Sequence, residues 1–172
     1  MAVCRRKARW SRFRTAPTDT VPPSLYYTSA HGAGGESKPL VIHCSDPRYQ
    51  PHFQEFLETG LGLAHYALIA VPGGAHCLTL SDFLPKFAWA GWRWVKVMEN
   101  VAQPERIILI AHDDCRWYVS MGFVSGAASL RERQIADLKT ARKALAERFN
   151  RKVDLYYARL EGDHAVFENL SA

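Results

Sequence analysis

Short apolar runs alternate with longer segments of helical periodicity along the part of the chain that follows residue 38. Four runs of mainly aliphatic or aromatic residues predict strands: Leu40–His43, Ala67–Val71, Arg106–Ala111 and Val153–Tyr157. A tight turn is expected after the last run, at Glu161–Asp163, where glycine interrupts the apolar pattern.

Three helices are predicted between these strands. Pro51 suits the first turn of a helix that reaches Thr59, and Gly60 is the expected terminator. Ser81 is a candidate cap for a second, longer helix. Its apolar positions, interpreted as core, are Phe83, Phe87, Trp94, Val95, Met98 and Val101. A third helix is indicated by Leu130, Leu138, Ala141, Leu145 and Phe149.

The order of these elements predicts an α/β fold with a mainly parallel sheet flanked by helices. Residues 1–38 are punctuated by proline and glycine, which predicts an extended N-terminal arm and linker. Residues 39–172 then form a single domain, a size that suits one hydrophobic core. No apolar run is long enough to cross a bilayer, so no membrane partner is expected.

The formal net charge of +5 comes from the N-terminal segment. Residues 1–19 hold Arg5, Arg6, Lys7, Arg9, Arg12 and Arg14 against Asp19 alone. The chain has 22 basic and 17 acidic residues, so sixteen of each remain beyond that segment. We therefore expect no specific nucleic-acid binding by the domain. The basic segment either packs on a partner subunit, stays mobile, contacts RNA or an anionic surface, or serves as a transit peptide.

Two short motifs follow predicted strands and carry metal-binding residue types. Cys44 begins the segment Cys-Ser-Asp-Pro-Arg at the end of the first strand, and His112 and Cys115 follow the third. Parallel strands that are neighbours would bring these side chains together, because ligands gather at the carboxyl ends of such strands. Two cysteines and one histidine suit a zinc site that keeps its fourth position for water.

These two motifs resemble the beta-class carbonic anhydrases, whose mark is Cys-x-Asp-x-Arg followed downstream by His-x-x-Cys. The resemblance runs from about Pro39 to Cys115 and more loosely to the end of the chain. It implies zinc-dependent reversible hydration of carbon dioxide to bicarbonate by a zinc-bound hydroxide, since zinc lowers the pKa of bound water to about 7. It also implies at least a homodimer with pockets near the subunit boundary.

The resemblance assigns roles around the metal. Asp46 would accept the proton of the zinc hydroxide, and Arg48 would hold that carboxylate by a forked contact. In some members of the family this aspartate binds zinc as a fourth ligand instead, and an ordinary ion pair at a loop remains a further alternative for the two residues. The loop with Gly73 and Gly74 lies where the family has a glycine-containing loop, and its backbone N–H groups are candidates for substrate binding.

Departures from the family pattern bear on the substrate. Arg116 stands where glycine is usual, and Trp117 and Tyr118 follow it. The glycine loop Pro72–Ala75 also departs from the common Arg-Asn-Ala-Gly-Asn form. Two alternatives therefore stay open: a related zinc enzyme acting on another small substrate, such as carbon disulfide or carbonyl sulfide, and a non-catalytic protein in which zinc contributes only to folding.

Several other histidine, cysteine and tryptophan residues are expected to have structural roles. His43 is expected to be packed or hydrogen-bonded. Cys77 and His76 follow the glycine loop and could reach the site, but a small buried thiol and a surface imidazole are the expected outcomes. Trp89 and Trp92 lie off the apolar stripe of their helix and are candidates for covering a subunit interface. No secretory apolar segment is present at the start, so a reducing cytoplasm is the expected compartment.

Overall fold

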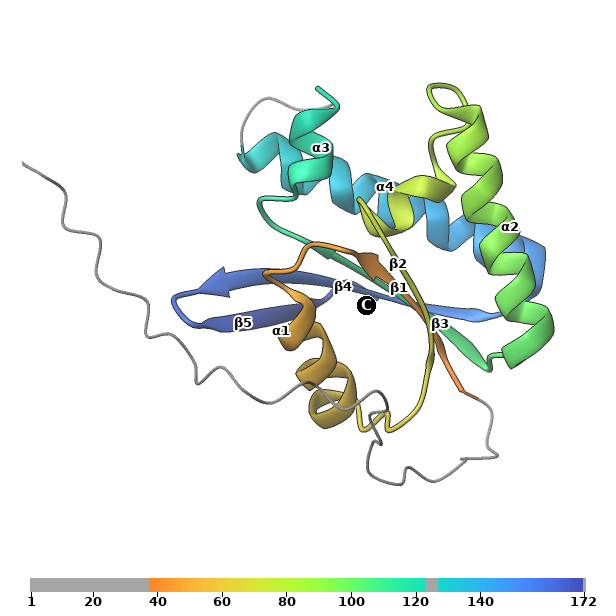
Figure 1. Ribbon diagram of the computed structural model, residues 1–172, viewed down its shortest axis with the longest axis horizontal. Helices are drawn as coiled ribbons and strands as arrows, with labels where there is room; N and C mark the ends of the chain where they lie inside the picture. Colours follow the sequence, from red (N-terminus) through yellow and green to blue (C-terminus); the bar gives the residue numbers. More distant parts are fainter. Residues whose placement is uncertain (1–37, 123–126, 172) are drawn as a thin grey trace, which may run out of the picture. The chain divides into compact units, whose positions relative to one another are not determined.

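A computed structural model of the protein describes residues 38–122 and 127–171, and these residues form a domain around a five-stranded sheet of order β2-β1-β3-β4-β5 (Figure 1). The strands are β1 (Leu40–Cys44), β2 (Ala67–Val71), β3 (Arg106–His112), β4 (Lys152–Glu161) and β5 (His164–Asn169). The first four pair in parallel, and β5 runs antiparallel to β4. The predicted mainly parallel sheet is therefore confirmed. Apart from Lys38, the predicted N-terminal arm lies outside the described residues.

Helices cover both faces of this sheet (Figure 1). The helical elements are α1 (Gln50–Glu55), the π-helical turn η1 (Phe56–Gly60), the 3₁₀ turn η2 (Gly74–Leu78), α2 (Pro85–Ala102), α3 (Arg116–Ser120) and α4 (Ala127–Phe149). One face packs against α2, α4 and η2, and the opposite face packs against α1 and η1. Successive side chains of a strand point to opposite faces, so both must be apolar, as the fully buried β1 shows.

The predicted bounds of the first three strands agree with the structure to within one residue, whereas β4 continues beyond the predicted end at Tyr157 to Glu161. Pro51 lies in the first turn of α1, and the π-helical turn ends at Gly60, as predicted. The prediction that Ser81 caps the long helix is wrong. That helix begins at Pro85 with Leu84 at the N-cap position and no side-chain cap, because proline at a first turn loses no helical hydrogen bond. The short elements β5, α3 and η2 were not predicted.

The interpretation of the α2 stripe as core is only partly correct. Val95 is buried and Phe87 and Met98 are half-buried, but Phe83 and Val101 are 68% and 78% exposed. The buried side of the helix instead carries Ala88, Gly91, Val95 and Glu99, of which the first two are small. A Cβ on Gly91 would lie 2.8 Å from the sulfur of Cys77, so glycine permits this close approach.

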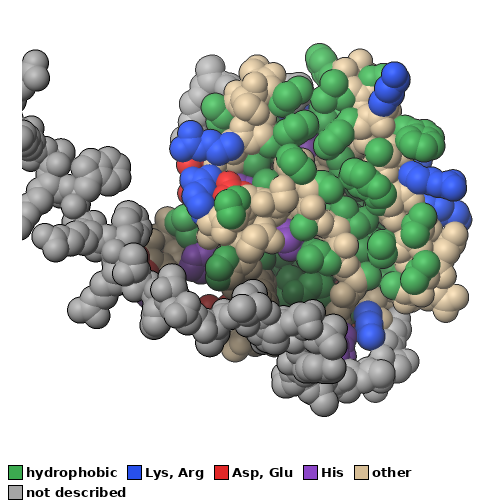
Figure 2. Space-filling view, in the orientation of Figure 1, with side chains coloured by type: hydrophobic (Ala, Val, Ile, Leu, Met, Phe, Trp, Pro, Cys, Tyr) green, Lys and Arg blue, Asp and Glu red, His purple; other side chains and the backbone are tan. Residues whose placement is uncertain are grey.

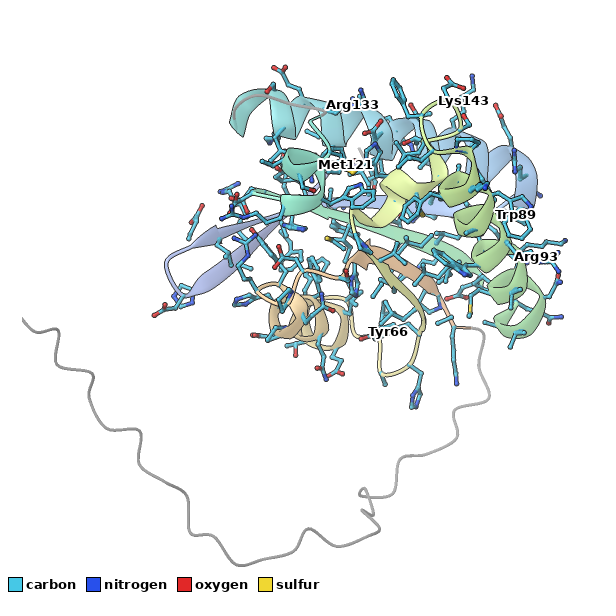
Figure 3. All side chains as sticks on the ribbon, turned by 45° about the horizontal axis from the view of Figure 1, so that its top comes forward. Tyr66, Trp89, Arg93, Met121, Arg133 and Lys143 are labelled. Carbon is cyan, nitrogen blue, oxygen red and sulfur yellow. The ribbon has the colours of Figure 1, made fainter. Side chains whose placement is uncertain are left out.

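A second apolar row runs along the outer side of α2, and we call it the outer α2 stripe. Its members alternate at spacings of four and three residues: Phe83, Phe87, Ala90, Trp94, Val97 and Val101. Figure 2 shows hydrophobic side chains gathered on the side where α2 lies, and Figure 3 shows Trp89 and Arg93 pointing outward from this helix. Trp89 is 70% exposed, whereas Trp92 is half-buried and donates its indole N–H to the Leu78 carbonyl at 3.2 Å.

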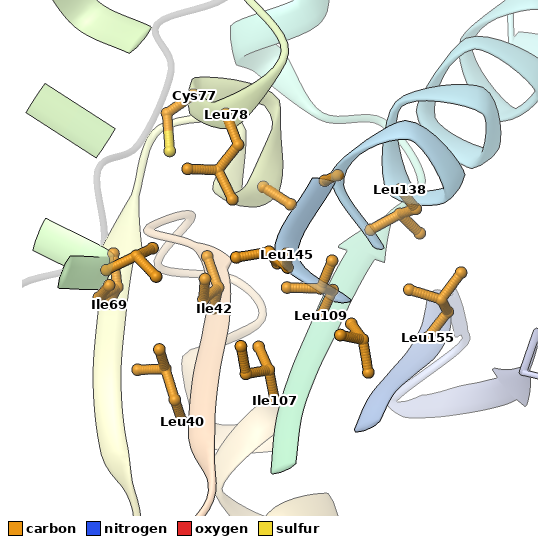
Figure 4. Packing of buried hydrophobic residues seen from close by; sticks show 14 residues of the cluster. Leu40, Ile42, Ile69, Cys77, Leu78, Ile107, Leu109, Leu138, Leu145 and Leu155 are labelled. Atoms are coloured by element: carbon orange, nitrogen blue, oxygen red, sulfur yellow. The ribbon is translucent and has the colours of Figure 1, made fainter. Parts of the chain in front are cut away.

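The main core lies between the sheet and the helix pair α2 and α4 (Figure 4). It includes Leu40, Ile42, Ile69, Ile107, Leu109, Leu138, Leu145 and Leu155. Each fully buried side chain of this size contributes about 1.5–3 kcal/mol relative to an exposed one. This packing fixes β1 beside β3 and so aligns the ends from which the two cysteine motifs emerge. Within the described residues, no helix is long and apolar enough to span a membrane.

Candidate metal centre

Neighbouring parallel strands bring the two motifs together, as predicted. Cys44 ends β1, His112 ends β3, and Cys115 follows three residues later. The candidate ligand atoms of these three residues all lie within 4.8 Å of one another, and all three side chains are buried. They form the one such cluster found among the described residues.

The backbone after β3 reverses sharply so that Cys115 can face His112. Asp114 adopts a left-handed conformation with φ of 47°. Aspartate tolerates this region better than most residues because its short side chain can bond locally. Cys115 then lies in extended conformation at the N-cap of α3, where its side chain joins the cluster instead of capping the helix.

The hydrogen bonding of His112 leaves one ring nitrogen for a metal. Its Nδ1–H donates to the carbonyl of Asp113 at 2.7 Å. Its Nε2 is buried and has no hydrogen-bond partner among the described residues. A buried imidazole nitrogen without a partner costs free energy unless a ligand or metal satisfies it. This arrangement is typical of a histidine ligand, whose other nitrogen is fixed by a backbone carbonyl.

The two cysteines lie close enough to share a metal ion. Their sulfurs are 3.8 Å apart, and the Cys44 sulfur also accepts the backbone N–H of Gly73 at 3.3 Å. The hydrogen bond from Cys115 lowers the pKa of Cys44, and the same bond together with burial raises the pKa of Cys115. One of the two sulfurs is therefore readily a thiolate. Two sulfurs and one imidazole nitrogen fit zinc, so Cys44, His112 and Cys115 would hold that ion.

Asp46 and Arg48 form a forked ion pair beside the cluster. Arg48 Nη2 lies 2.7 Å from Asp46 Oδ2, and Arg48 Nε lies 3.0 Å from Asp46 Oδ1. These hydrogen bonds hold the pKa of Asp46 below its ordinary value. Arg48 also donates to the side chain of Asp114 at 2.6 Å and to its carbonyl at 2.9 Å. The guanidinium thus ties the first motif to the second.

A cavity of about 550 Å³ opens beside the cluster and reaches it at Cys44. It is lined by Cys44, Ser45, Asp46, Pro47, Arg48, Pro72, Arg116, Trp117 and Ser120. The side chain of Arg116 is 75% exposed, and its Nη2 lies 3.6 Å from Asp114 Oδ2, so this cation lies at the mouth of the cavity.

Trp117 forms one wall of this cavity and is fixed by three neighbours. Its ring stacks on Phe87 with centroids 5.2 Å apart, and its Nε1–H donates to Nδ1 of His76 at 3.1 Å. Gly73 has φ of 75°, and a Cβ there would lie 2.2 Å from the indole. Glycine is therefore required at this position both for the backbone and for the close approach of the ring.

His76 was expected at the surface, and this expectation is wrong. It is 1% exposed, stacks on Tyr118 with centroids 4.2 Å apart, and its Nε2 lies 3.6 Å from a carboxylate oxygen of Asp137. Burial lowers the pKa of His76 to about 4. The short 3₁₀ turn that points this residue inward has no periodicity that a sequence could show.

The expectations for His43 and Cys77 are confirmed. His43 is buried, packs against Phe53 with centroids 4.6 Å apart, and donates Nδ1–H to the Cys44 carbonyl at 2.9 Å. Cys77 is a buried free thiol whose pKa is raised by burial to about 12.

Three residues that contact the site were missed: Tyr49, Asp113 and Asp114. Asp113 and Asp114 are the two spacer residues between the predicted ligands, and Tyr49 directly follows the first motif. Only their positions next to the motifs could have predicted that these residues contact the site. Residue type alone carried none, since tyrosine and aspartate occur commonly in loops and at strand ends.

No family model matches the chain, and no curated protein matches it in sequence. In structure it is similar to a protein described among two tetrameric beta-carbonic anhydrases from Sordaria macrospora, with 13% identity, a TM-score of 0.50 and coverage of 81% of this chain and 84% of that one. The beta-carbonic anhydrase CafA of Aspergillus fumigatus is also similar, with 15% identity, a TM-score of 0.43 and coverage of 78% and 76%. The described domain therefore has the fold of the beta-carbonic anhydrases, as a divergent example of it.

Proposed function

We propose that this protein is a zinc-dependent carbonic anhydrase that interconverts carbon dioxide and bicarbonate. One observation carries the proposal. Cys44, one of the three residues of the buried cluster, lines the same cavity as the forked pair of Asp46 and Arg48. Zinc, when bound, would supply a Lewis acid that lowers the pKa of water to about 7.

Asp46 and Arg48 are proposed to orient the attacking water. Arg48 holds Asp46 in a fixed direction and lowers its pKa, so the carboxylate stays an acceptor across neutral pH. A carboxylate that accepts the water's hydrogen bond can turn an oxygen lone pair toward carbon. The alternative role of Asp46 as a fourth zinc ligand is less favoured here, because both its oxygens already accept hydrogen bonds from Arg48.

The walls of the cavity suit a small apolar substrate. Trp117 and Pro72 supply apolar surface, while the two arginine side chains, Arg48 and Arg116, are the more exposed charged groups and lie toward the rim. We propose that Gly73 and Gly74 contribute to substrate binding. Gly73 donates its N–H to the Cys44 sulfur and leaves the space that Trp117 occupies.

A homo-oligomer is part of the proposal, since the similar structure from Sordaria macrospora is described as tetrameric. The outer α2 stripe offers apolar side chains for such a contact. It is continuous with the cavity, because Phe87 of the stripe stacks on Trp117 of the cavity wall. A reducing cytoplasm suits Cys44, Cys77 and Cys115, the free cysteines of the described residues.

A related zinc enzyme acting on carbon disulfide or carbonyl sulfide is the second candidate. A narrow apolar tunnel to the metal would favour that reaction. The cavity here is open and has a charged rim formed by Arg48 and Arg116, which favours carbon dioxide and a charged product.

Stopped-flow measurement of carbon dioxide hydration by the zinc-loaded protein, from neutral to alkaline pH, tests the proposal. Asp46→Asn should keep its zinc and lose about 10²-fold or more of kcat/KM, because a positioned proton acceptor contributes at least this much. Asp163→Asn, in the exposed turn between β4 and β5, should leave the rate unchanged. A zinc-loaded wild type without hydration at any pH would refute the proposed function.

A further inference from the structure

The two loops that carry the candidate ligands are joined by two contacts from consecutive residues. Arg48 reaches Asp114, and the hydroxyl of Tyr49 donates to the carboxylate of Asp113. Asp113 and Asp114 are the two residues between His112 and Cys115. Both spacer residues of the second motif are thus held by side chains from the end of the first.

Tyr49 is itself rigidly placed. It is 1% exposed, its backbone N–H donates to the Asp46 carbonyl at 3.2 Å, and its own carbonyl accepts the N–H of Phe53 at 2.8 Å as α1 begins. Its ring lies against the imidazole of His112 with centroids 4.2 Å apart. One side chain therefore contacts both the ring of a candidate ligand and the residue that follows it.

Asp113 connects this contact to the direction of the imidazole. Its N–H donates to the Ala158 carbonyl at 2.9 Å, which extends the pairing of β3 with β4, and its own carbonyl accepts Nδ1–H of His112 at 2.7 Å. Its carboxylate accepts the Tyr49 hydroxyl. The carbonyl that fixes the His112 tautomer thus belongs to a residue held at both its backbone and its side chain.

We infer that Tyr49 is a positioning residue of the metal centre, acting through Asp113 and through ring contact to aim Nε2 of His112 at the ion. This inference rests on the metal-binding part of the proposed function and does not depend on the reaction catalysed. Partners in the outer shell of a metal site typically contribute about 10–100-fold in metal affinity, because they orient the ligand before the metal arrives.

Tyr49→Phe keeps the ring and removes the hydroxyl, and Asp113→Ala removes the acceptor and keeps the backbone carbonyl. Each should weaken zinc binding by about 10–100-fold in competition with a chromophoric chelator. The double variant should lose little more than either single variant, because both remove one contact. The ligand-field absorption of the cobalt-loaded protein should also change in both, since the histidine is reoriented.

Tyr156→Phe is the matched control. Tyr156 is a buried tyrosine on the same face of the sheet, where it packs against Phe56 with centroids 5.0 Å apart. Its substitution should leave the zinc affinity and the cobalt spectrum unchanged. An equal loss in Tyr156→Phe would show a general effect on the fold and would overturn the inference.

The remaining outcomes separate the inference from the proposed function. Zinc affinity within about threefold of wild type in Tyr49→Phe, or in Asp113→Ala if the first variant does not fold, would overturn the inference alone. A wild type that binds zinc without hydrating carbon dioxide would refute the proposed function and leave the inference to its own test. A wild type without measurable zinc affinity would overturn both.

Discussion

The metal centre and the outer α2 stripe depart from the usual partition of residues in opposite ways. At the metal centre, ionisable side chains are buried: His112 is 0% exposed and Cys115 is 1% exposed. On the outer side of α2, large apolar side chains are exposed, including Trp94 at 39% and Val101 at 78%. Each arrangement costs free energy in an isolated chain unless another group compensates for it.

The two regions differ in how far this chain compensates by itself. At the metal centre, neighbouring residues already fix the donors: Asp113 holds His112, and Gly73 donates to Cys44. One metal ion would complete the set. The outer α2 stripe is fixed to the cavity wall through Phe87, which stacks on Trp117, and it leaves Trp94, Val97 and Val101 exposed. In the proposed homo-oligomer, a second copy of the chain would cover these side chains. Directional hydrogen bonds therefore determine what the metal centre can bind, whereas exposed apolar area determines what the outer α2 stripe can bind.

Removing a ligand should produce the largest effect. Cys115→Ser replaces a thiolate with a weakly acidic hydroxyl, and it should weaken zinc binding by about 10³-fold or more, because thiolate bonds supply much of the binding free energy. Zinc content after dialysis against a chelator measures this. The unfolding midpoint of the wild type should rise with added zinc, whereas that of the variant should not.

Cys77→Ser is the control for the ligand variant. Cys77 is also a buried free thiol, but it lies in the core against Gly91 and outside the metal cluster. It should lose stability and keep its zinc. Equal zinc loss in the two serine variants would mean that folding, and not ligation, controls metal binding.

The contrast between the regions also explains what the sequence could predict. The first four strands, their parallel order and the meeting of Cys44, His112 and Cys115 were predictable, because short apolar runs and the residue types Cys, His and Cys each have few interpretations. The inward and outward stripes of α2 could not be separated. Both have helical spacing, and the side that faces the sheet was decided by the small residues Ala88 and Gly91, which a hydrophobic pattern undervalues. The inward direction of His76 depended on a five-residue turn with no period of its own.

Disrupting the outer α2 stripe should have the next largest effect. Trp94→Glu places a charge at the middle of the stripe, and it should weaken self-association by more than about tenfold, since large aromatic anchors dominate interfaces. Sedimentation velocity over a range of concentrations measures this. Zinc content should not change, because Trp94 does not contact the metal cluster.

Lys143→Gln on α4 is the control, since it changes the net charge by the same single unit at an exposed position (Figure 3). Salt gives a second discriminating measurement. Lys86 and Arg93 flank the stripe, so two copies that meet there bring like charges together, and salt should strengthen their association. A monomer at all salt concentrations would contradict a second copy as the partner. Self-association that weakens with salt would show that attraction between opposite charges, and not the outer α2 stripe, holds the copies together.

The smallest expected effect concerns the pH dependence of stability that arises from His76, which is buried beside Trp117 of the cavity wall. The pKa of His76 is lowered from 6.5 to about 4 by burial, with Asp137 raising it and Arg133 lowering it further. In the unfolded chain this histidine takes up a proton below its ordinary pKa, whereas in the folded chain it stays neutral until near pH 4. The unfolded state thus binds more protons in this window, so the contribution to stability is fully present above pH 6.5 and is lost as the pH falls toward 4.

Urea unfolding of the metal-free protein should therefore lose about 1–2 kcal/mol between about pH 7 and about pH 5 through this residue. His76→Gln cannot titrate and still offers an acceptor to Trp117, so its stability should fall less over the same interval. His65→Gln, at an exposed histidine, should behave as the wild type does. Identical pH dependence in wild type and His76→Gln would mean that acid destabilises this protein through other groups. It would also mean that His76 binds a proton as readily in the folded chain as in the unfolded chain.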